Sequence, residues 1–398
     1  ERLAEFVPRA GRYGRDRNHV QVGAFNVSRL SPAIRHGLIR GEECVAAAVT
    51  RYAPSTIEKF TQEIYWRRYW KSWLSLRPQV WVQYLEDLER MRTDADLRPD
   101  LERLERCEAG EGEIAVMNHF ARELVATGYL HNHARMWFAG WWIHVERLPW
   151  QLGADFFFRH LLDADPASNT LSWRWVAGLQ TPGKTYLPRR SNIEKYLDPA
   201  ILADHSDGLE LLERPIALLP VDPVRPAITR AELADGGELR AEERSGLWIH
   251  EEDLLPESGP LEDVEPAAVL VQGNHDGWNA HRLPQARRDW IRRALEDAAG
   301  RAERHFGRPV ARSFDGEGPR ALLKWAREAK LAQVVAMRPD VGPLDDRLTA
   351  CRDALAGAGI SLVLVDRPED LRLRKLANGG FFQFWKRIQP LINGNQSS

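Results

Sequence analysis

The segment Asp163-Ala-Asp-Pro-Ala-Ser-Asn-Thr-Leu-Ser-Trp-Arg-Trp175 brings two carboxylates, an amide and two indoles together in a short stretch of chain. Hydrogen-bonding groups set among large aromatic rings suit a big planar ligand with polar edges better than they suit a plain hydrophobic core. Two upstream segments repeat this mixture. Together, the three segments decide how the first half of the chain is interpreted.

The first upstream segment carries a stripe of mixed chemistry. Glu63, Trp66, Arg67 and Trp70 stand at offsets 0, +3, +4 and +7, which an α-helix places on one face. Taken alone, this stripe is more typical of an amphipathic helix with its aromatic residues in the core and its charges at the rim.

The second upstream segment shifts that interpretation toward a ligand site. Asn132, Arg135 and Met136 stand at offsets 0, +3 and +4, so a helix presents an amide, a guanidinium and a soft apolar group together. Three separate segments with the same mixture favour one shared ligand.

The surrounding chain, over about 28–175, is predicted to be all-α, because apolar residues recur at three- and four-residue spacings. Ser55 and Glu58 fit a capping box at the start of one helix. Further helices are expected over 113–127 and 132–144.

The pattern changes in the second half. Residues 201–265 are rich in proline and acidic runs, which indicates a connecting region with short elements. Residues 266–398 alternate short β-rich runs with helical patterns, which predicts a small α/β domain with a parallel, Rossmann-like sheet. The expected strands are 267–271, 310–314, 332–337 and 360–366, and the expected helices are 284–305, 319–329 and 344–358. We therefore divide the chain into a helical domain over 1–200, the connecting region and the α/β domain.

Composition narrows the class of protein. The 398 residues are 43% hydrophobic and 28% charged, and no apolar run approaches the ~18 residues that a spanning helix needs. Residues 1–200 carry 28 Lys and Arg against 25 Asp and Glu, while 201–398 carry 27 against 32, so a nucleic-acid site must be a local patch in the first half. Three separated cysteines and the absence of a secretory pattern in residues 1–17 predict a cytoplasmic protein.

Four ordered segments resemble one known family. They are Asn26-Val-Ser-Arg-Leu-Ser-Pro32, Glu63-Ile-Tyr-Trp-Arg67, Thr127-Gly-Tyr-Leu-His-Asn-His-Ala-Arg-Met136 and the opening segment. They look like the flavin-binding domain of the DNA photolyase and cryptochrome family, and the resemblance runs from Tyr13 to about Tyr186. It implies that FAD is the cofactor and that the helical region is the FAD-binding domain.

The resemblance assigns cofactor-binding roles. Ser28, Leu30 and Ser31, assisted by Tyr13, match the segment that cradles the FAD diphosphate at a helix start, where the helix dipole favours anions. Val27 replaces the family's usual threonine there. The matches nearer the flavin are Arg67 close to the phosphates, Arg135 and Asp163 as an ion pair, Asp165 at the ring N3–H edge, and Asn169 facing N5.

The resemblance also assigns substrate-binding roles. Glu63 matches the carboxylate that hydrogen-bonds a damaged pyrimidine pair, Trp66 and Trp175 match the indoles that flank the flipped lesion, and Asn132 and Met136 match other lining residues. Replacement stacking by an indole is worth ~1–3 kcal/mol per base. Photolyases specific for the (6-4) lesion usually have histidines at the last two positions, so the cyclobutane dimer is the expected substrate. DNA containing such dimers is the expected partner, while the oligomeric state is left open.

Tryptophan is the outlying residue type, with 15 copies, ten of them in the first 200 residues. By resemblance, Trp173 and Trp150 are the first two members of a chain that passes electrons to photoexcited flavin. The third, surface member falls near Cys107. A second exit through Trp137, Trp141 or Trp142 and simple packing of these three indoles are equal alternatives.

The second half offers weaker signals. Gly273-Asn-His-Asp276 looks like a metallophosphoesterase loop, but the other Asp and His ligands are missing, so no metal site is predicted. Gly379-Gly-Phe-Phe-Gln-Phe-Trp-Lys-Arg387 resembles the segment that ends the amino-terminal α/β domain of photolyases. The domain order is thus permuted, and the α/β domain either holds a second, antenna chromophore or only braces the helical domain.

Three functions remain. The leading hypothesis is a light-driven, FAD-dependent photolyase that repairs cyclobutane pyrimidine dimers. Reduced flavin would donate an electron to the flipped dimer, with Glu63, Asn169, Trp150 and Trp173 as the catalytic residues. The alternatives are a cryptochrome-like blue-light photoreceptor without repair activity and a flavoprotein with no photochemical role.

Overall fold

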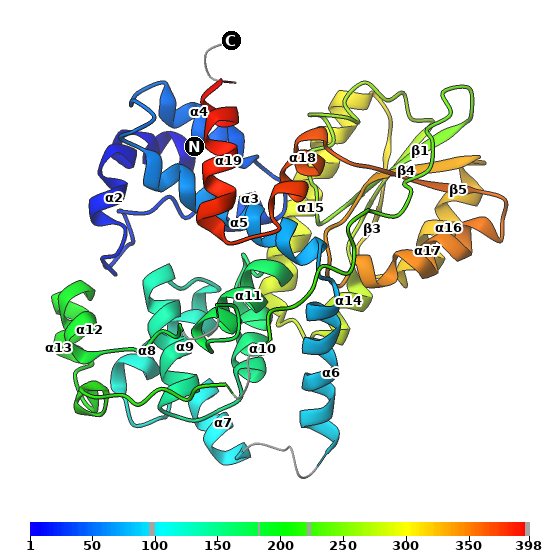
Figure 1. The fold of residues 1–398 in the computed structure, drawn as a ribbon. Coiled ribbons are helices and arrows are strands. Elements are labelled where there is room, and N and C mark those ends of the chain that lie inside the picture. The colour runs from blue at the N-terminus through cyan, green and yellow to red at the C-terminus, as the bar shows by residue number, and fades with distance from the viewer. Residues whose placement is uncertain (95–99, 182–183, 221–223, 395–398) are drawn as a thin grey trace.

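The computed structural model describes residues 1–94, 100–181, 184–220 and 224–394. Helices fill the first half of the chain, and a parallel sheet with helices on both faces fills most of the second (Figure 1). The final helix returns to the helical half, where it lies close to the early helices (Figure 1). The expected fold class, a helical domain followed by an α/β domain, is confirmed.

The helical half is built on a long central helix, α5 (Glu58–Ser75), against which several other helices pack. Glycines end two other helices of this half: Gly110 and Gly128 follow α7 (Leu101–Ala109) and α8 (Ala115–Thr127) at φ 70° and 66°, a left-handed conformation that glycine adopts without strain. The helices of this half are α1 (Arg2–Phe6), η1 (Val7–Arg12), α2 (Tyr13–Asp16), α3 (Ser31–Arg35), α4 (Gly41–Val49), α5, α6 (Gln79–Thr93), α7, α8, α9 (Asn132–His144), α10 (Trp150–His160), α11 (Pro166–Val176), α12 (Arg190–Tyr196), α13 (Pro199–Asp204) and η3 (Leu209–Leu212).

The sheet of the second half is parallel throughout the described residues, with strand order β3-β2-β1-β4-β5. Leu247 of the central strand pairs with Val269 of β2 and Val335 of β4. Parallel strands need crossover helices, and here these cover both faces of the sheet. The elements are β1 (Ser245–His250), β2 (Ala268–Gln272), α14 (His275–Ala280), α15 (Gln285–Phe306), β3 (Val310–Ser313), α16 (Gly318–Glu328), β4 (Gln333–Met337), η4 (Asp345–Arg347), α17 (Leu348–Ala356), β5 (Ser361–Val365), α18 (Pro368–Leu376) and α19 (Phe381–Gly394).

Alternation along each strand divides the α/β core into two layers. Leu247 and Ile249 point to the face covered by α14 and α15, whereas Trp248 points to the face covered by α16 and α17. Because successive side chains of a strand point to opposite faces, both layers are apolar and the sheet is buried on both sides.

The structure differs from the sequence-based expectations at three places. The predicted connecting region, 201–265, contains β1, the middle strand of the sheet. The predicted α/β segment, 266–398, ends in α19, whose apolar face belongs to the core of the helical half. The capping box predicted at Ser55 does not form: α5 begins at Glu58 with Ile57 at its N-cap and no side-chain capping bond.

Candidate functional site

A cavity of about 790 Å³ opens in the helical half among α2, α3, α5, α9 and α11. This volume lies within the ~300–1,000 Å³ usual for ligand sites. The cavity collects the sequence-predicted site residues except Trp150, which does not line it. Those that line it are Tyr13, Ser28, Leu30, Ser31, Glu63, Trp66, Arg67, Asn132, Arg135, Met136, Asp163, Asp165, Asn169, Trp173 and Trp175.

Helix geometry explains why three distant segments meet there. The stripe predicted on α5 is a stripe in the structure, because Glu63, Trp66, Arg67 and Trp70 all line the cavity. α9 begins at Asn132 and contributes its first turn.

The buried carboxylate of Asp163 is held by two arginines. Arg135 donates to both of its oxygens, at 3.1 and 3.0 Å, and the Arg67 guanidinium lies 3.6 Å away. Burial disfavours the charged form, but these cations outweigh it and hold the pKa of Asp163 below its usual range. The carboxylate is therefore ionised at neutral pH, and the predicted Arg135–Asp163 ion pair is present.

Asp165 has an oxygen at the cavity wall that lies near two cations but accepts no hydrogen bond from the described residues. It is the N-cap of α11: its Oδ1 accepts from the backbone N–H of Ser168 at 2.9 Å. Its Oδ2 is buried, and the Oγ of Ser168 also lines the cavity; neither atom has a hydrogen-bond partner among the residues that the structure describes. Burial raises the pKa of Asp165, but Lys71, Arg67 and Arg35 lower it to about 2.

These orphaned atoms fit a bound cofactor. A buried polar atom without a partner is costly, so an unpaired oxygen at a cavity wall indicates a ligand with a complementary hydrogen-bond donor. A flavin ring edge offers such donors, and Arg67 and Arg135 supply positive charge in the same cavity for phosphates. The residues present therefore fit FAD.

The predicted diphosphate segment lies at the start of the short helix α3. Leu30 is its N-cap, and the side chain of Ser31 hydrogen-bonds Asp163. The Oγ of Ser28 accepts a long bond of 3.4 Å from the backbone of Leu30. The amide of Asn169 donates to the carbonyl of Ala154 at 2.8 Å, which fixes its orientation at the cavity.

Two predicted substrate residues have partners that the sequence did not suggest. Glu63 forms an ion pair with Arg17, while burial raises the pKa of its carboxyl group. The ring of Trp66 stacks on Phe381 of α19, with centroids 3.7 Å apart and planes 10° apart. One face of Trp66 is therefore covered, and Phe382, which is 65% exposed, stands at the cavity beside it.

Indoles form a continuous path away from the cavity. The ring centroids of Trp173 and Trp142 lie 6.2 Å apart, and those of Trp142 and Trp141 lie 6.4 Å apart. Trp150 instead stacks on Tyr84 at 5.7 Å. Cys107, at the position expected for the surface member, is buried, and burial raises its pKa to about 12.

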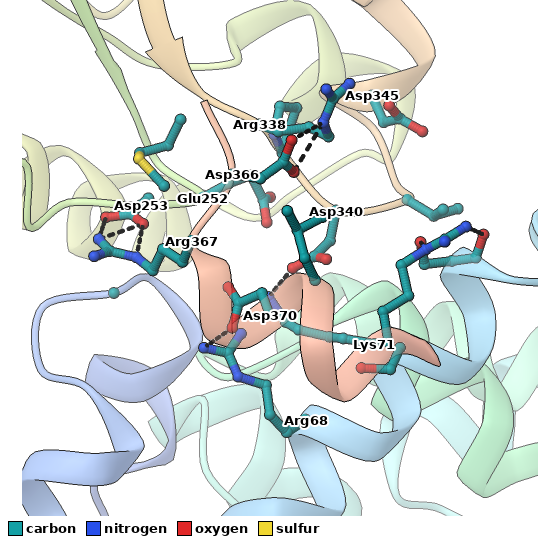
Figure 2. A pocket seen from close by; sticks show the side chains of 18 of the residues that line it. Arg68, Lys71, Glu252, Asp253, Arg338, Asp340, Asp345, Asp366, Arg367 and Asp370 are labelled. Carbon is teal, nitrogen blue, oxygen red and sulfur yellow. Dashed lines mark hydrogen bonds and ion pairs between the residues drawn. The ribbon is translucent and has the colours of Figure 1, made fainter. Parts of the chain in front are cut away.

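A second, smaller cavity of about 370 Å³ lies between the helical half and the carboxyl ends of β4 and β5. Figure 2 shows that its charged side chains pair with one another. Arg68 contacts Asp370 at 2.6 Å and Lys71 contacts Asp340 at 2.9 Å. Binding of the predicted second chromophore can be tested at this cavity.

Sequence reasoning missed several residues that act on the main cavity. Arg17 and Lys71 stand one helical turn from Tyr13 and Arg67, so helical spacing could have identified them. Arg35 and Phe381 have no such local signal, because their contacts come from distant parts of the chain.

His133 is buried against Trp137, its Nδ1 lies 2.7 Å from the carbonyl oxygen of Asn18, and burial lowers its pKa. Among the residues that the structure describes, no three His, Cys, Asp or Glu side chains are grouped to hold a metal ion. Within the same residues, no helix has the length and apolar character needed to cross a membrane.

Comparison with known proteins gives one consistent result. Residues 60–201 match the family described as the FAD binding domain of DNA photolyase. The deoxyribodipyrimidine photo-lyase of Streptomyces griseus is 30% identical over 164 residues, 41% of this chain and 34% of that protein. A cryptochrome DASH of Ostreococcus tauri is 29% identical over 200 residues, 48% of this chain and 35% of that protein. A crystal structure of a bacterial class III photolyase from Agrobacterium tumefaciens gives a TM-score of 0.41 at 25% identity, covering 49% of this chain and 41% of that chain.

The family match, over residues 60–201, falls on the helical half, where the cavity lies. The chain spans about a third of the length of the curated relatives named above, and these carry both photolyase and cryptochrome names. Residues 60–201 are thus similar to the FAD-binding domain of the DNA photolyase and cryptochrome family.

Proposed function

We propose that this protein is a light-driven, FAD-dependent photolyase that repairs cyclobutane pyrimidine dimers in DNA. One observation carries the proposal: a single cavity holds both the charged set that fits FAD and the predicted lesion-binding set of Glu63, Trp66, Met136 and Trp175. A cofactor and a substrate that exchange an electron must lie in one water-poor pocket.

The cofactor supplies the electron when it is reduced and excited by light, and the protein supplies its position and surroundings. Arg67 and Arg135 would pair with the phosphates of FAD and with the buried carboxylate of Asp163. Asp165 would accept a hydrogen bond from the ring edge, and Asn169 would face the ring. Trp66 and Trp175 would replace the stacking that a flipped dinucleotide loses. Glu63 would leave its ion pair with Arg17 and form a hydrogen bond with the pyrimidine pair.

The raised pKa of Glu63 supports this role. Burial favours its neutral form, and a protonated carboxyl group can donate a hydrogen bond to a pyrimidine carbonyl. Arg17 opposes that protonation, so displacement of Arg17 by DNA phosphates would free Glu63 for the lesion.

The experiment is repair of an oligonucleotide with one thymine dimer, in single and double strands, by protein with fully reduced FAD under blue or near-UV light. Wild type is expected to restore thymines only in the light. Glu63→Gln should lower the yield, whereas Glu86→Gln, an exposed carboxylate on α6, should not. Intact dimers after illumination of the wild type would refute the proposal.

A cryptochrome-like photoreceptor is the second candidate, and a specific observation favours it. Glu63 is paired with Arg17 and one face of Trp66 is covered, so both main substrate groups already have protein partners. A photoreceptor would bind no dimer in the dark, and Glu63→Gln would leave its light-induced spectral change intact. If illumination left the flavin spectrum unchanged, the flavoprotein without photochemistry would be the correct assignment.

A further inference from the structure

Lys71 lies between the flavin-type cavity and the α/β half. It stands one turn after Arg67 on α5, and its side chain is 11% exposed. Its Nζ is 2.9 Å from Asp340 Oδ2 and 3.6 Å from Asp165 Oδ2. Figure 2 shows the side chain reaching Asp340 from α5. One cation therefore contacts a carboxylate on each side of the boundary between the two halves.

Lys71 contacts the oxygen of Asp165 that accepts no hydrogen bond from the described residues. Oδ1 is committed to capping α11, and Oδ2 is buried without a hydrogen bond at the wall of the large cavity. Among the described residues, Arg67 at 3.5 Å and Lys71 at 3.6 Å form ion pairs with this oxygen. In a buried site a charge at this distance is weakly screened, so each cation strongly affects how negative the cavity is.

Asp340 connects the charge balance at Asp165 to the sheet of the α/β half. It is the third residue after the end of β4, following Arg338 and Pro339, and its side chain is 43% exposed. A second link acts on the same short loop: buried Arg35 donates to the carbonyl of Ala164 at 3.0 Å and to both oxygens of Glu252, at 2.6 and 2.7 Å. Segments after two neighbouring strands, β1 and β4, therefore support the loop that carries Asp165.

We propose that Lys71 is a positioning residue that neutralises Asp165 at the flavin cavity and, through Asp340, ties the reduction potential of the bound flavin to the α/β half. The proposal rests on FAD binding in this cavity, as in the proposed function, but it does not depend on DNA repair. An unbalanced carboxylate near the ring disfavours an added electron, so the cation makes reduction easier.

The test is the flavin midpoint potential of the full chain with FAD bound, measured for four proteins. Lys71→Met is expected to shift the potential to a more negative value than in the wild type, and Lys71→Arg to restore it. Asp340→Asn removes the carboxylate that competes for Lys71, so its potential should become more positive than that of the wild type, and an unchanged potential would overturn the link to the α/β half. The double variant should match Lys71→Met, because Asp340 acts only through Lys71.

A purely bracing role predicts a different pattern. Lys71→Met and Asp340→Asn would then lower the unfolding temperature alike and leave the potential and absorption spectrum unchanged, which would overturn the proposal. Wild-type protein that binds FAD but repairs no dimers would refute the repair function and leave this inference standing. Wild-type protein that takes up no FAD would overturn both.

Discussion

The rings of Trp66 and Phe381 lie parallel, 3.7 Å apart, and join the central helix α5 to the C-terminal helix α19. Phe381 also contacts Tyr69 and Trp385, and it is almost fully buried. The segment that resembles the end of a photolyase α/β domain thus completes the wall of the cavity in the helical half.

Phe381→Ala should destabilise the protein by about 3–5 kcal/mol, because it removes a buried aromatic ring and leaves a cavity beside Trp66. Urea unfolding followed by tryptophan fluorescence measures the loss. Phe382→Ala is the matched control: its ring is 65% exposed, so the change should stay within about 0.5 kcal/mol. Equal losses in both variants would mean that the stack does not stabilise the contact of α19 with α5.

Phe382→Ala should instead weaken the binding of dimer-containing DNA in the dark. An exposed phenyl ring at the cavity can stack on a base, which is worth about 1–3 kcal/mol, so affinity should fall by roughly 5-fold to 100-fold. Fluorescence anisotropy with a labelled oligonucleotide measures this. Leu239→Ala removes an exposed apolar side chain that does not line the cavity and should bind as the wild type does. Unchanged affinity for Phe382→Ala would exclude this ring from the DNA site.

Trp142→Phe should slow photoreduction of oxidised flavin severalfold, because Trp142 is the indole in ring contact with Trp173. The measurement is the rate of flavin bleaching under blue light with an external reductant. Trp137→Phe is the control, since it also removes a buried indole and one Nε1 hydrogen bond from α9.

The route predicted from the sequence, through Trp150, gives the opposite result. If Trp150→Phe slows bleaching and Trp142→Phe does not, electrons leave through Trp150 and Tyr84, whose rings stack at 5.7 Å.

Glu251→Gln should stabilise the protein at alkaline pH. Burial raises the pKa of this carboxyl group to about 7, above the ~4.3 expected in the unfolded chain, so the folded state loses stability as pH rises between these values. Glutamine keeps an oxygen acceptor for Asn274 and Trp278 and cannot ionise. The variants should be equally stable below about pH 4, and the gap should grow to at most about 4 kcal/mol by pH 8. A gap that does not change with pH would show that Glu251 does not titrate in this range.

The sequence predicted the features that depend on local order. Helical spacing placed Glu63, Trp66, Arg67 and Trp70 on one face, and the structure puts all four at the cavity. The alternation of strands and helices after Pro266 predicted the parallel sheet. This alternation did not predict β1, because Ser245–His250 stands in a proline-rich, acidic stretch with no helix pattern before it. The roles assigned to the cavity residues stay predictions.

By itself, then, the sequence determined the fold class and the stripes of α5 and α9, because helical and strand periodicities are fixed by backbone geometry. The resemblance to the photolyase family supplied the other predicted residues of the cavity. Only the tertiary structure decided which charged groups pair with these residues and which ring faces are covered. Lys71 balances Asp165, Arg17 pairs with Glu63, and Phe381 covers Trp66. All three contacts join residues far apart in sequence, and burial sets their strength, so the local sequence pattern does not reveal them.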